Sequence, residues 1–401
     1  MVGRNASLAL VGDLAAKLGL LAVVVVAARA LSTVEYARLG VALAAAGILA
    51  TVLDAGVSVL LVRDGARDAA RRGELFRAAL RGRVPFLAGV AAAGIVLGAV
   101  TGQLALVVAS IALAAANAAT LSVLALFRAA QDLRYEAVAK LASGLLWPLA
   151  AVAAALVYRS ASAVVIALAA VVVLGVAVLL PCSRRVVLRR GAVPAIGTLR
   201  AALPLGLLAA ATLVYFRSGT IMLGAWSSPE QTAAFTIASS VGFGLLLIPN
   251  AITTGLLPRL AAESNDAARG EVTRRAVAWT AAICLAVAGI TVALAPALLP
   301  LLVGARYTDA VRPLTILAAA SVLIGVSGTL GTWLVAERRM RILGLQVALS
   351  LAVNLGIGAL LVRRFGADGA AWATVATEAT ALLVLAAAVV RRWPAGLAEA
   401  A

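Results

Sequence analysis

The chain has 401 residues, 64% of them hydrophobic, and a mean hydropathy of +1.07. Soluble domains contain only about 45–50% apolar residues, so no water-soluble fold can bury this much apolar surface. The apolar residues form runs of roughly 18 to 25, the helix length that crosses a hydrocarbon core of about 30 Å. The composition therefore excludes a soluble enzyme or binding module and indicates a chain that crosses a membrane many times.

The chain is strongly basic, with 34 Lys and Arg against 17 Asp and Glu, and it contains no His. Clustered basic residues can bind nucleic-acid phosphates, but here they lie between the apolar runs, so membrane topology explains them better. The two cysteines, Cys182 and Cys284, offer neither a disulfide framework nor a metal-ligand spacing. We therefore expect no nucleic-acid partner, no metal and no cofactor.

The apolar runs predict an all-α membrane protein with about twelve transmembrane helices. The first run is longer than the hydrophobic region of a signal peptide, so we interpret it as a retained helix. In chain order the predicted spans are Ser7–Ala28, Tyr36–Leu61, Val84–Val100, Leu104–Phe127, Ala137–Val157, Ala163–Leu180, Ala201–Ala225, Thr232–Leu257, Ala276–Leu299, Leu314–Ala336, Ile342–Leu361 and Gly369–Val390.

The distribution of basic residues predicts the orientation of these spans. Cytoplasmic loops of membrane proteins are enriched in Lys and Arg. Here one set of alternate loops holds 25 of the 34 basic residues and the other set holds 7, while Lys17 and Arg217 lie inside spans. This asymmetry predicts a multi-pass protein of the cytoplasmic membrane with both termini in the cytoplasm.

A weak internal repeat divides the chain at an offset of about 195 residues. The segment Leu31-Ser-Thr-Val-Glu-Tyr36 has a counterpart in Trp226-Ser-Ser-Pro-Glu-Gln231, and each is followed by a helix rich in small residues. We predict two six-helix bundles, residues 1–195 and 196–401. An even number of helices per unit keeps both copies in the same orientation, which makes this a parallel repeat and is typical of transporters with a central cavity.

Two features argue against catalysis by this chain. Every predicted outer loop is short, whereas membrane polymerases and ligases of cell-envelope glycans usually carry their catalysis on a long external loop. The sequence also lacks G-x-x-x-x-G-K-[ST], the phosphate-binding loop of nucleotide-driven motors. We therefore expect a transporter and not an enzyme, and the sequence leaves open whether a proton or sodium gradient drives it.

Charged residues inside the spans are the first candidates for functional sites, because a charge at mid-bilayer costs at least about 2.5–3.5 kcal/mol. Asp13 and Lys17 lie four residues apart with the acid first, the favourable order on a helix. They form either a self-neutralising pair or an ion-coupling site that opens when substrate competes for Lys17. Arg217 matches phosphate oxygens in a bidentate way and therefore suits a phosphorylated lipid head group, unless it extends to the outer interface.

Three further residues are weaker candidates. Glu378 lies about ten residues, or roughly 15 Å, into the last span, and Thr374, Thr377 and Thr380 surround it. It is either an ion-coupling residue or a carboxylate held by local hydrogen bonds. Asp54, near the cytoplasmic end of the second span, is either an ion-coupling residue or an anchor at a helix end. Asn250 follows Pro249, which is expected to interrupt helical hydrogen bonds near a cavity.

Several segments together resemble the polysaccharide-transporter (Wzx-type) flippases over nearly the whole chain. The resemblance covers the first two helices, the seventh and eighth helices and the last helical pair. It rests on Ala28-Arg-Ala-Leu-Ser-Thr-Val-Glu-Tyr36, Leu53-Asp-Ala-Gly56, Leu61-Val-Arg63, Leu203-Pro204, Tyr215-Phe-Arg217, Ile221-Met-Leu223, Ile248-Pro-Asn250, Leu257-Pro258, Val353-Asn-Leu355 and Phe365-Gly-Ala-Asp-Gly-Ala-Ala-Trp-Ala373.

This resemblance implies the two-bundle fold of the multidrug-and-toxin-extrusion (MATE) transporters and of the peptidoglycan-precursor flippase. It also implies movement of undecaprenyl-pyrophosphate-linked oligosaccharides to the outer leaflet, and it matches Arg29, Asp54, Arg217 and Glu378 to polar positions of the family. The chain departs from the family at Ser218-Gly219, where members often have Asp. That departure casts doubt on any coupling scheme that needs a carboxylate there.

We therefore predict an alternating-access flippase for a lipid-linked oligosaccharide. Lys17, Arg29, Arg217 and Asn250 would bind substrate, and Asp13, Asp54 and Glu378 would couple transport to an ion. The expected partners are the lipid-linked oligosaccharide and membrane lipids, together with a polysaccharide polymerase and glycosyltransferases. The alternatives are a drug or organic-cation antiporter on the same fold, which needs carboxylates facing the cavity, and a non-transporting scaffold with a filled cavity.

Overall fold

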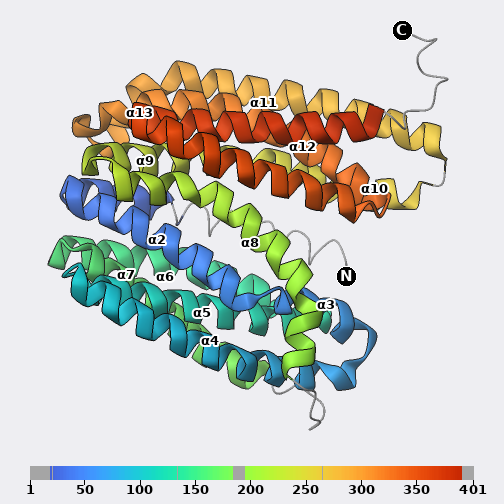
Figure 1. The fold of residues 1–401 in the computed structure, drawn as a ribbon, viewed down its shortest axis with the longest axis horizontal. Coiled ribbons are helices and arrows are strands. Elements are labelled where there is room, and N and C mark those ends of the chain that lie inside the picture. The colour runs from blue at the N-terminus through green and yellow to red at the C-terminus, as the bar shows by residue number, and fades with distance from the viewer. Residues whose placement is uncertain (1–18, 20, 133, 184–194, 264, 391–401) are drawn as a thin grey trace. The chain divides into compact units, whose positions relative to one another are not determined.

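The computed structural model describes residues 19, 21–132, 134–183, 195–263 and 265–390, and all of the regular elements within these ranges are helices (Figure 1). The chain divides into two compact units, Met1–Arg217 and Ser218–Ala401, each taken here over its described residues. The boundary falls within helix α8 (Ala195–Trp226), whose first residue is the expected boundary of the repeat.

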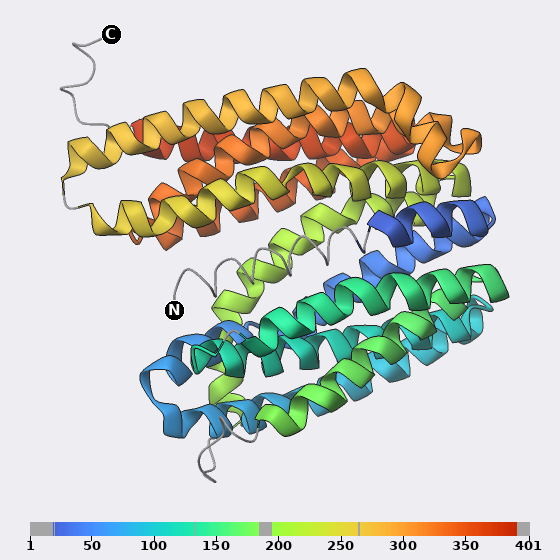
Figure 2. The same ribbon diagram turned by 180° about the vertical axis from the view of Figure 1, so that it is seen from behind.

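The first unit is a helical bundle built around α5, which contacts α2, α3, α4 and α7. Figure 2 shows this bundle from behind. It begins with the short helix Leu21–Ala30 and includes the first part of α8. Its remaining elements are α2 (Thr33–Asp54), α3 (Val57–Arg67), the 3-10 turn η1 (Ala69–Arg71), α4 (Arg72–Val100), α5 (Leu104–Ala129), α6 (Arg134–Tyr158) and α7 (Ala161–Ser183).

The second unit repeats this plan around α12, which contacts α9, α10, α11 and α13. Its long helix α13 folds back on itself at Gly366, where the backbone has a φ of 55°. The two arms lie side by side, because Asn354 on the first arm donates to Thr377 on the second. The elements of this unit are α9 (Pro229–Leu245), α10 (Leu247–Ala262), α11 (Asp266–Val303), η2 (Ala305–Ala310), α12 (Val311–Ala336) and α13 (Met340–Val390).

The predicted fold class is confirmed. Within the described residues, 10 helical stretches are long and apolar enough to cross a membrane. The last of them, Met340–Val389, contains the fold-back at Gly366 and so supplies the last two predicted spans. The helix Leu21–Ala30 belongs to the first predicted span, which agrees with about twelve helices in two parallel-repeat bundles.

In both units, a side chain near the start of one helix accepts a hydrogen bond from the backbone at the start of another. Ser32 caps α2 and accepts a hydrogen bond from the Glu35 amide, and Ser228 caps α9 in the same way with Gln231. The Glu35 carboxylate then accepts from the Ala161 amide at the start of α7 (2.7 Å). The counterpart of Glu35 is therefore Gln231 and not Glu230, one residue beyond the register expected from the sequence.

The Gln231 side chain completes this correspondence in the second unit. Its amide oxygen accepts from the backbone of Ala367, just beyond the fold-back of α13 (2.9 Å). In both units, then, the side chain at the third position of one helix holds the start of the last helix. Because each contact ends on a backbone amide at a helix start, it satisfies a donor that a helix start otherwise leaves unpaired.

Helix α4 begins well before the predicted third span and contains a buried arginine. We expected the third span to begin at Val84, but α4 begins at Arg72, and its Arg83 is buried. The Arg83 guanidinium donates to the Asp54 carboxylate at 2.7 Å and to the Ser122 hydroxyl at 2.8 Å. An arginine is tolerated at such a position when a carboxylate and other acceptors replace its water. The predicted start of the third span, Val84, was therefore too late, because the helix already begins at Arg72.

Asp54 ends α2 at a sharp break before α3. Ala55 and Gly56 both adopt left-handed conformations, with φ of 49° and 76°. The second Asp54 oxygen accepts from the Ser58 hydroxyl at 2.7 Å and from the Ser58 amide at 3.3 Å, in the first turn of α3. Helix α8 packs against the break, because a Cβ on Gly206 would lie 2.2 Å from the Ala55 carbonyl carbon. The break is thus held from two sides, by an ion pair and by a backbone contact.

Replacing Arg83 with Met should destabilise the protein strongly. The substitution leaves the buried Asp54 carboxylate without its cationic partner, a change that costs about 3–5 kcal/mol when one member of a buried pair is removed. The melting temperature of the purified protein in detergent should fall accordingly. The double variant Arg83→Met with Asp54→Leu should recover much of the loss, and Arg274→Met at an exposed pair should change little. A double variant no more stable than Arg83→Met alone would contradict the pairing.

Replacing Gly206 with Ala should also destabilise the first unit. The added methyl group meets backbone atoms of Ala55 and Gly56 that cannot rotate away, and such overpacking costs about 1–3 kcal/mol. Gly89→Ala on α4 is the matched control, because nothing lies within 4 Å of the position that its Cβ would take. Equal melting temperatures for the two variants would rule out close packing of α8 on the break.

Candidate functional site

A chain of buried polar side chains runs through the second unit between α8 and the two arms of α13. The Ser218 hydroxyl donates a short hydrogen bond to the Asn354 side-chain oxygen. The Asn354 amide donates to the Thr377 hydroxyl at 3.0 Å. The Ser350 hydroxyl reaches the Thr377 carbonyl at 3.4 Å and accepts from the Gln346 amide at 3.1 Å. All five side chains are buried, so the chain forms one connected polar interior.

The local sequence explains how these side chains come together. Gln346, Ser350 and Asn354 are spaced by four residues and therefore lie on one face of the first arm of α13. The turn at Gly366 brings the second arm back along that face. Gly369 permits the close approach, because a Cβ there would lie 2.0 Å from the Leu361 carbonyl oxygen. The glycines of the turn thus determine which residues of the two arms face each other.

Glu378 follows Thr377 on the second arm and is only 3% exposed. The hydroxyl hydrogens of the three nearby threonines are used within their own helix. Thr374, Thr377 and Thr380 each donate to the backbone carbonyl four residues earlier in their own helix, at 3.1, 2.7 and 2.9 Å. A carboxylate at this depth is costly unless a proton, a cation or another partner neutralises it. The position suits a group whose charge changes during a working cycle.

The remaining predicted site residues are distributed as follows. Asp54 lies in the first unit and is paired with Arg83. Arg29 is exposed near the end of the helix Leu21–Ala30. Asn250 is exposed in the first turn of α10, with Pro249 before it. Asp13 and Lys17 lie outside the described residues.

Arg217 lies on α8 immediately before Ser218 and is half-buried. The rings of Tyr215 and Phe216 on the same helix are in contact, with centroids 4.4 Å apart. Arg217 is therefore covalently adjacent to the buried polar chain that includes Asn354 and Thr377. Arg217 thus precedes the first member of this network in the chain, and Glu378 follows Thr377 in the same way.

Sequence reasoning missed Ser218, Asn354, Ser350 and Gln346 as members of the site. Three of them carry a signal that could have been found, since polar residues at a spacing of four in an apolar span mark one helical face. Ser218 carried no such signal, because its partner lies 136 residues away. Within the part of the chain that the structure describes, no three His, Cys, Asp or Glu side chains gather as a metal site would require.

Three solved structures share this architecture. The lipid II flippase MurJ in an inward closed conformation aligns with a TM-score of 0.73 at 11% identity, covering 94% of this chain and 86% of that one. An inward-facing multidrug-resistance MATE transporter gives 0.66 at 14% identity and 94% of both chains. A mutant of the Vibrio cholerae MATE transporter VcmN gives 0.61 at 16% identity, over 97% and 98%. These likenesses show the fold.

Sequence comparison identifies the family. Comparison with curated proteins gives no significant match. The family model described as "polysaccharide biosynthesis protein" matches residues 2–264, which is more than half of the chain. The chain belongs to the polysaccharide biosynthesis protein family.

Proposed function

We propose that this protein is a flippase that moves an undecaprenyl-pyrophosphate-linked oligosaccharide across the cytoplasmic membrane by alternating access. The observation that carries the proposal is the combination of family and fold. The family concerns polysaccharide biosynthesis, and the two-bundle fold is that of a solved flippase for a lipid-linked precursor. No bond is made or broken in this cycle, because the protein only changes the side to which the head group is exposed.

Substrate binding is assigned to Lys17, Arg29, Arg217 and Asn250. Arginine pairs with phosphate oxygens through two parallel hydrogen bonds, which gives both energy and orientation. Arg217 is the best supported of the four, because it lies deep in α8 beside the buried polar chain. The pyrophosphate supplies the negative charge that this arginine requires inside the membrane.

Ion coupling is assigned to Glu378, with Asp13 as a second candidate. Binding of a proton or a small cation neutralises Glu378 and changes the hydrogen-bonding demands on its neighbour Thr377. Thr377 is linked through Asn354 to Ser218, and Ser218 adjoins Arg217. The proposed route therefore runs from the chain neighbour of Glu378 through three hydrogen-bonded side chains to Ser218, the residue that follows Arg217. Asp54 remains a predicted coupling residue, but its pairing with Arg83 favours a structural role.

A drug or organic-cation antiporter is the second candidate, supported by the fold likeness to MATE transporters. Such a site needs carboxylates to hold the cation. Among the described candidates, Asp54 already balances the charge of Arg83, which leaves Glu378 for this role. Among the described candidates, Arg29 and Arg217 are then the charged substrate-binding residues, which favours an anionic substrate.

Arg217→Ala should impair flipping of a lipid-linked oligosaccharide in proteoliposomes. Loss of charge-assisted hydrogen bonds worth about 1.5–3 kcal/mol predicts a reduction of roughly tenfold to a hundredfold in initial rate. Arg217→Lys keeps the charge but loses the bidentate geometry, so it should retain an intermediate rate. The rate is followed as the fraction of labelled lipid accessible to an enzyme added outside. Full activity of Arg217→Ala together with loss of drug export in Glu378→Gln would favour the antiporter.

Glu378→Gln should uncouple flipping from its driving gradient. The glutamine cannot gain or lose charge, so an imposed proton or sodium gradient should no longer accelerate transport, whereas slow equilibration of the lipid should persist. The test compares initial rates with and without each gradient in the same vesicles. Glu271→Gln on the exposed start of α11 is the control and should respond like the unchanged protein. A full gradient response in Glu378→Gln would exclude this coupling residue.

A further inference from the structure

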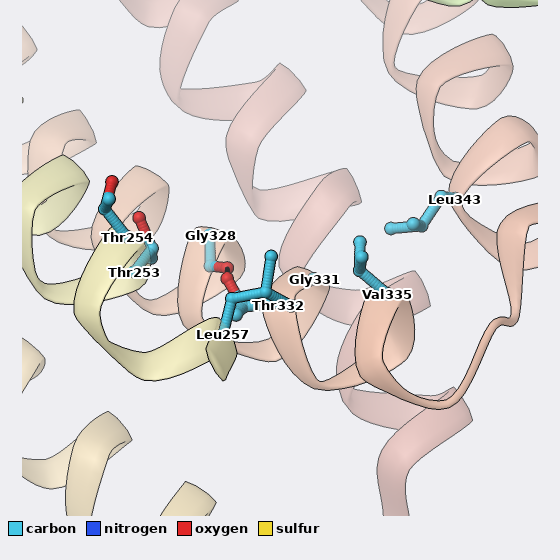
Figure 3. A pocket seen from close by; sticks show the side chains of 8 residues that line it. All are labelled: Thr253, Thr254, Leu257, Gly328, Gly331, Thr332, Val335 and Leu343. Carbon is cyan, nitrogen blue, oxygen red and sulfur yellow. Dashed lines mark hydrogen bonds between the residues drawn. The ribbon is translucent and has the colours of Figure 1, made fainter. Parts of the chain in front are cut away.

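The second unit contains a groove that the proposed cycle does not use. Its volume is 380 Å³, within the range of about 300–1,000 Å³ typical of small-molecule sites. It lies between the middle of α10 and the last turns of α12, with Leu343 from the start of α13 at one end (Figure 3). All of its lining residues belong to the second unit, so the groove is a feature of that unit alone.

The groove wall offers no hydroxyl hydrogen to a ligand. The Thr253 and Thr254 hydroxyls both donate to the Asn250 carbonyl, at 3.1 and 2.7 Å. The Thr332 hydroxyl donates to the Gly328 carbonyl at 2.8 Å. The threonines therefore contribute methyl groups and weak acceptors, beside the apolar side chains of Leu257 and its neighbours. Such a wall suits an aliphatic chain and is unsuited to a sugar or a phosphate, which need donors.

The groove is open where α12 has glycines, at positions where the equivalent helix α5 of the first unit has leucines. Helices α5 and α12 end alike: Gln131 and Arg338 both have positive φ and donate to the carbonyl three residues back. If the two helix ends are aligned, Leu124 of α5 is equivalent to Gly331 of α12, and Leu121 is equivalent to Gly328.

The matching helix α3 supplies the other wall of the first unit. The sequence Leu61-Val-Arg63 corresponds to Leu257-Pro-Arg259. Leu61 and Leu124 are fully or nearly buried in one hydrophobic cluster. Their counterparts differ: Leu257 is 37% exposed, and Gly331 has no side chain to reach it. The first unit thus has a buried leucine, Leu124, at the place of Gly331, and a 36% exposed leucine, Leu121, at the place of Gly328.

Three exposed arginines lie close in sequence to lining residues at one end of the groove. Arg259 follows Leu257 by two residues, Arg338 follows Val335 by three, and Arg341 precedes Leu343 by two. These arginines are exposed and form no ion pair within the described residues. Gly328 lies ten residues from Arg338, or about 15 Å along the helix. We infer that the groove extends from near these arginines, on the side predicted to be cytoplasmic, to roughly half the depth of a hydrocarbon core of about 30 Å.

We propose that this groove binds the isoprenoid chain of the lipid carrier next to its phosphate, with the phosphate at Arg259, Arg338 and Arg341. The branched chain is favoured over a straight acyl chain because the gaps at Gly328 and Gly331 widen the groove at two places one helical turn apart. The inference rests on the proposed function, since it supplies the part of the substrate that Arg217 does not contact. It gives the carrier a resting place in the inner leaflet before the head group is taken up.

Photo-crosslinking tests the groove with the intact protein in vesicles of phosphatidylethanolamine and phosphatidylglycerol. The probe is a polyprenyl monophosphate with a photoreactive group in its first isoprene units. We expect crosslinks on the peptides that contain Thr253–Leu257 and Gly328–Val335. Gly331→Leu restores the side chain of the first unit and should reduce crosslinking at least tenfold. Gly331→Ala should not, because its Cβ would lie at ordinary contact distance, 3.7 Å, from Leu343.

A second pair of variants keeps the test valid if Gly331→Leu folds poorly. Arg338→Ala and Arg341→Ala are exposed changes that should leave the melting temperature intact. Each should weaken binding of the polyprenyl phosphate by about fivefold, in line with roughly 1 kcal/mol per basic residue near a lipid phosphate. Binding of an uncharged polyprenol should be unaffected by either change.

Crosslinks that fall outside the groove peptides would overturn the proposal, and so would crosslinking that persists unchanged in a folded Gly331→Leu. The proposal would also fail if added straight-chain phosphatidylglycerol displaced the probe as well as an equal amount of unlabelled polyprenyl phosphate does. Because the probe carries no sugar, these results do not depend on flipping. A protein that binds the probe in the groove but flips no lipid-linked oligosaccharide would instead refute the proposed function and leave the groove standing.

Discussion

The absence of water from the bilayer interior constrains every polar group in this protein. A buried carboxylate, guanidinium or amide must find its partner within the chain. Arg83 meets this demand with Asp54, Ser122 and a backbone carbonyl, and Ser218 meets it with Asn354. These contacts join α2 to α4 and α5 in one unit and α8 to α13 in the other. The same requirement that makes polar residues costly therefore decides which helices are held together.

The two units satisfy this constraint with one plan but differ in what they leave open. Both begin their second helix with a serine cap and use Glu35 or Gln231 to hold the start of their last helix. The first unit then fills the space between α3 and α5 with leucines and locks its break with an ion pair. The second leaves a groove between α10 and α12 and contains the buried chain that adjoins Glu378. The first unit is thus held by a buried ion pair, and the second contains Glu378, whose charge is proposed to change.

Hydropathy and charge could predict the spans and the fold class, because both depend on local composition along the chain. They could not predict Arg83, which looks like a loop arginine until α4 is seen to begin at Arg72. Nor could they identify Gln231 as the counterpart of Glu35 in the repeat. One inserted residue shifts the register between the two units, and only the observed helix caps reveal it. Asn354 was visible as part of a family-like segment, but its partner Ser218 depends on tertiary packing. Local patterns thus predicted the elements, while contacts between distant residues determined the site.

The buried polar side chains also show what takes the place of an Asp after the arginine of α8. Ser218 donates to Asn354, and Asn354 donates in turn to Thr377, so neutral groups fill the position where a carboxylate was expected. A carboxylate there would accept hydrogen bonds and could not donate to the Asn354 oxygen. The buried carboxylate of this unit lies instead at Glu378, one residue beyond Thr377 on the second arm of α13. Charge and hydrogen bonding are separated in this way, with the carboxylate on the last helix and a donor beside Arg217 on α8.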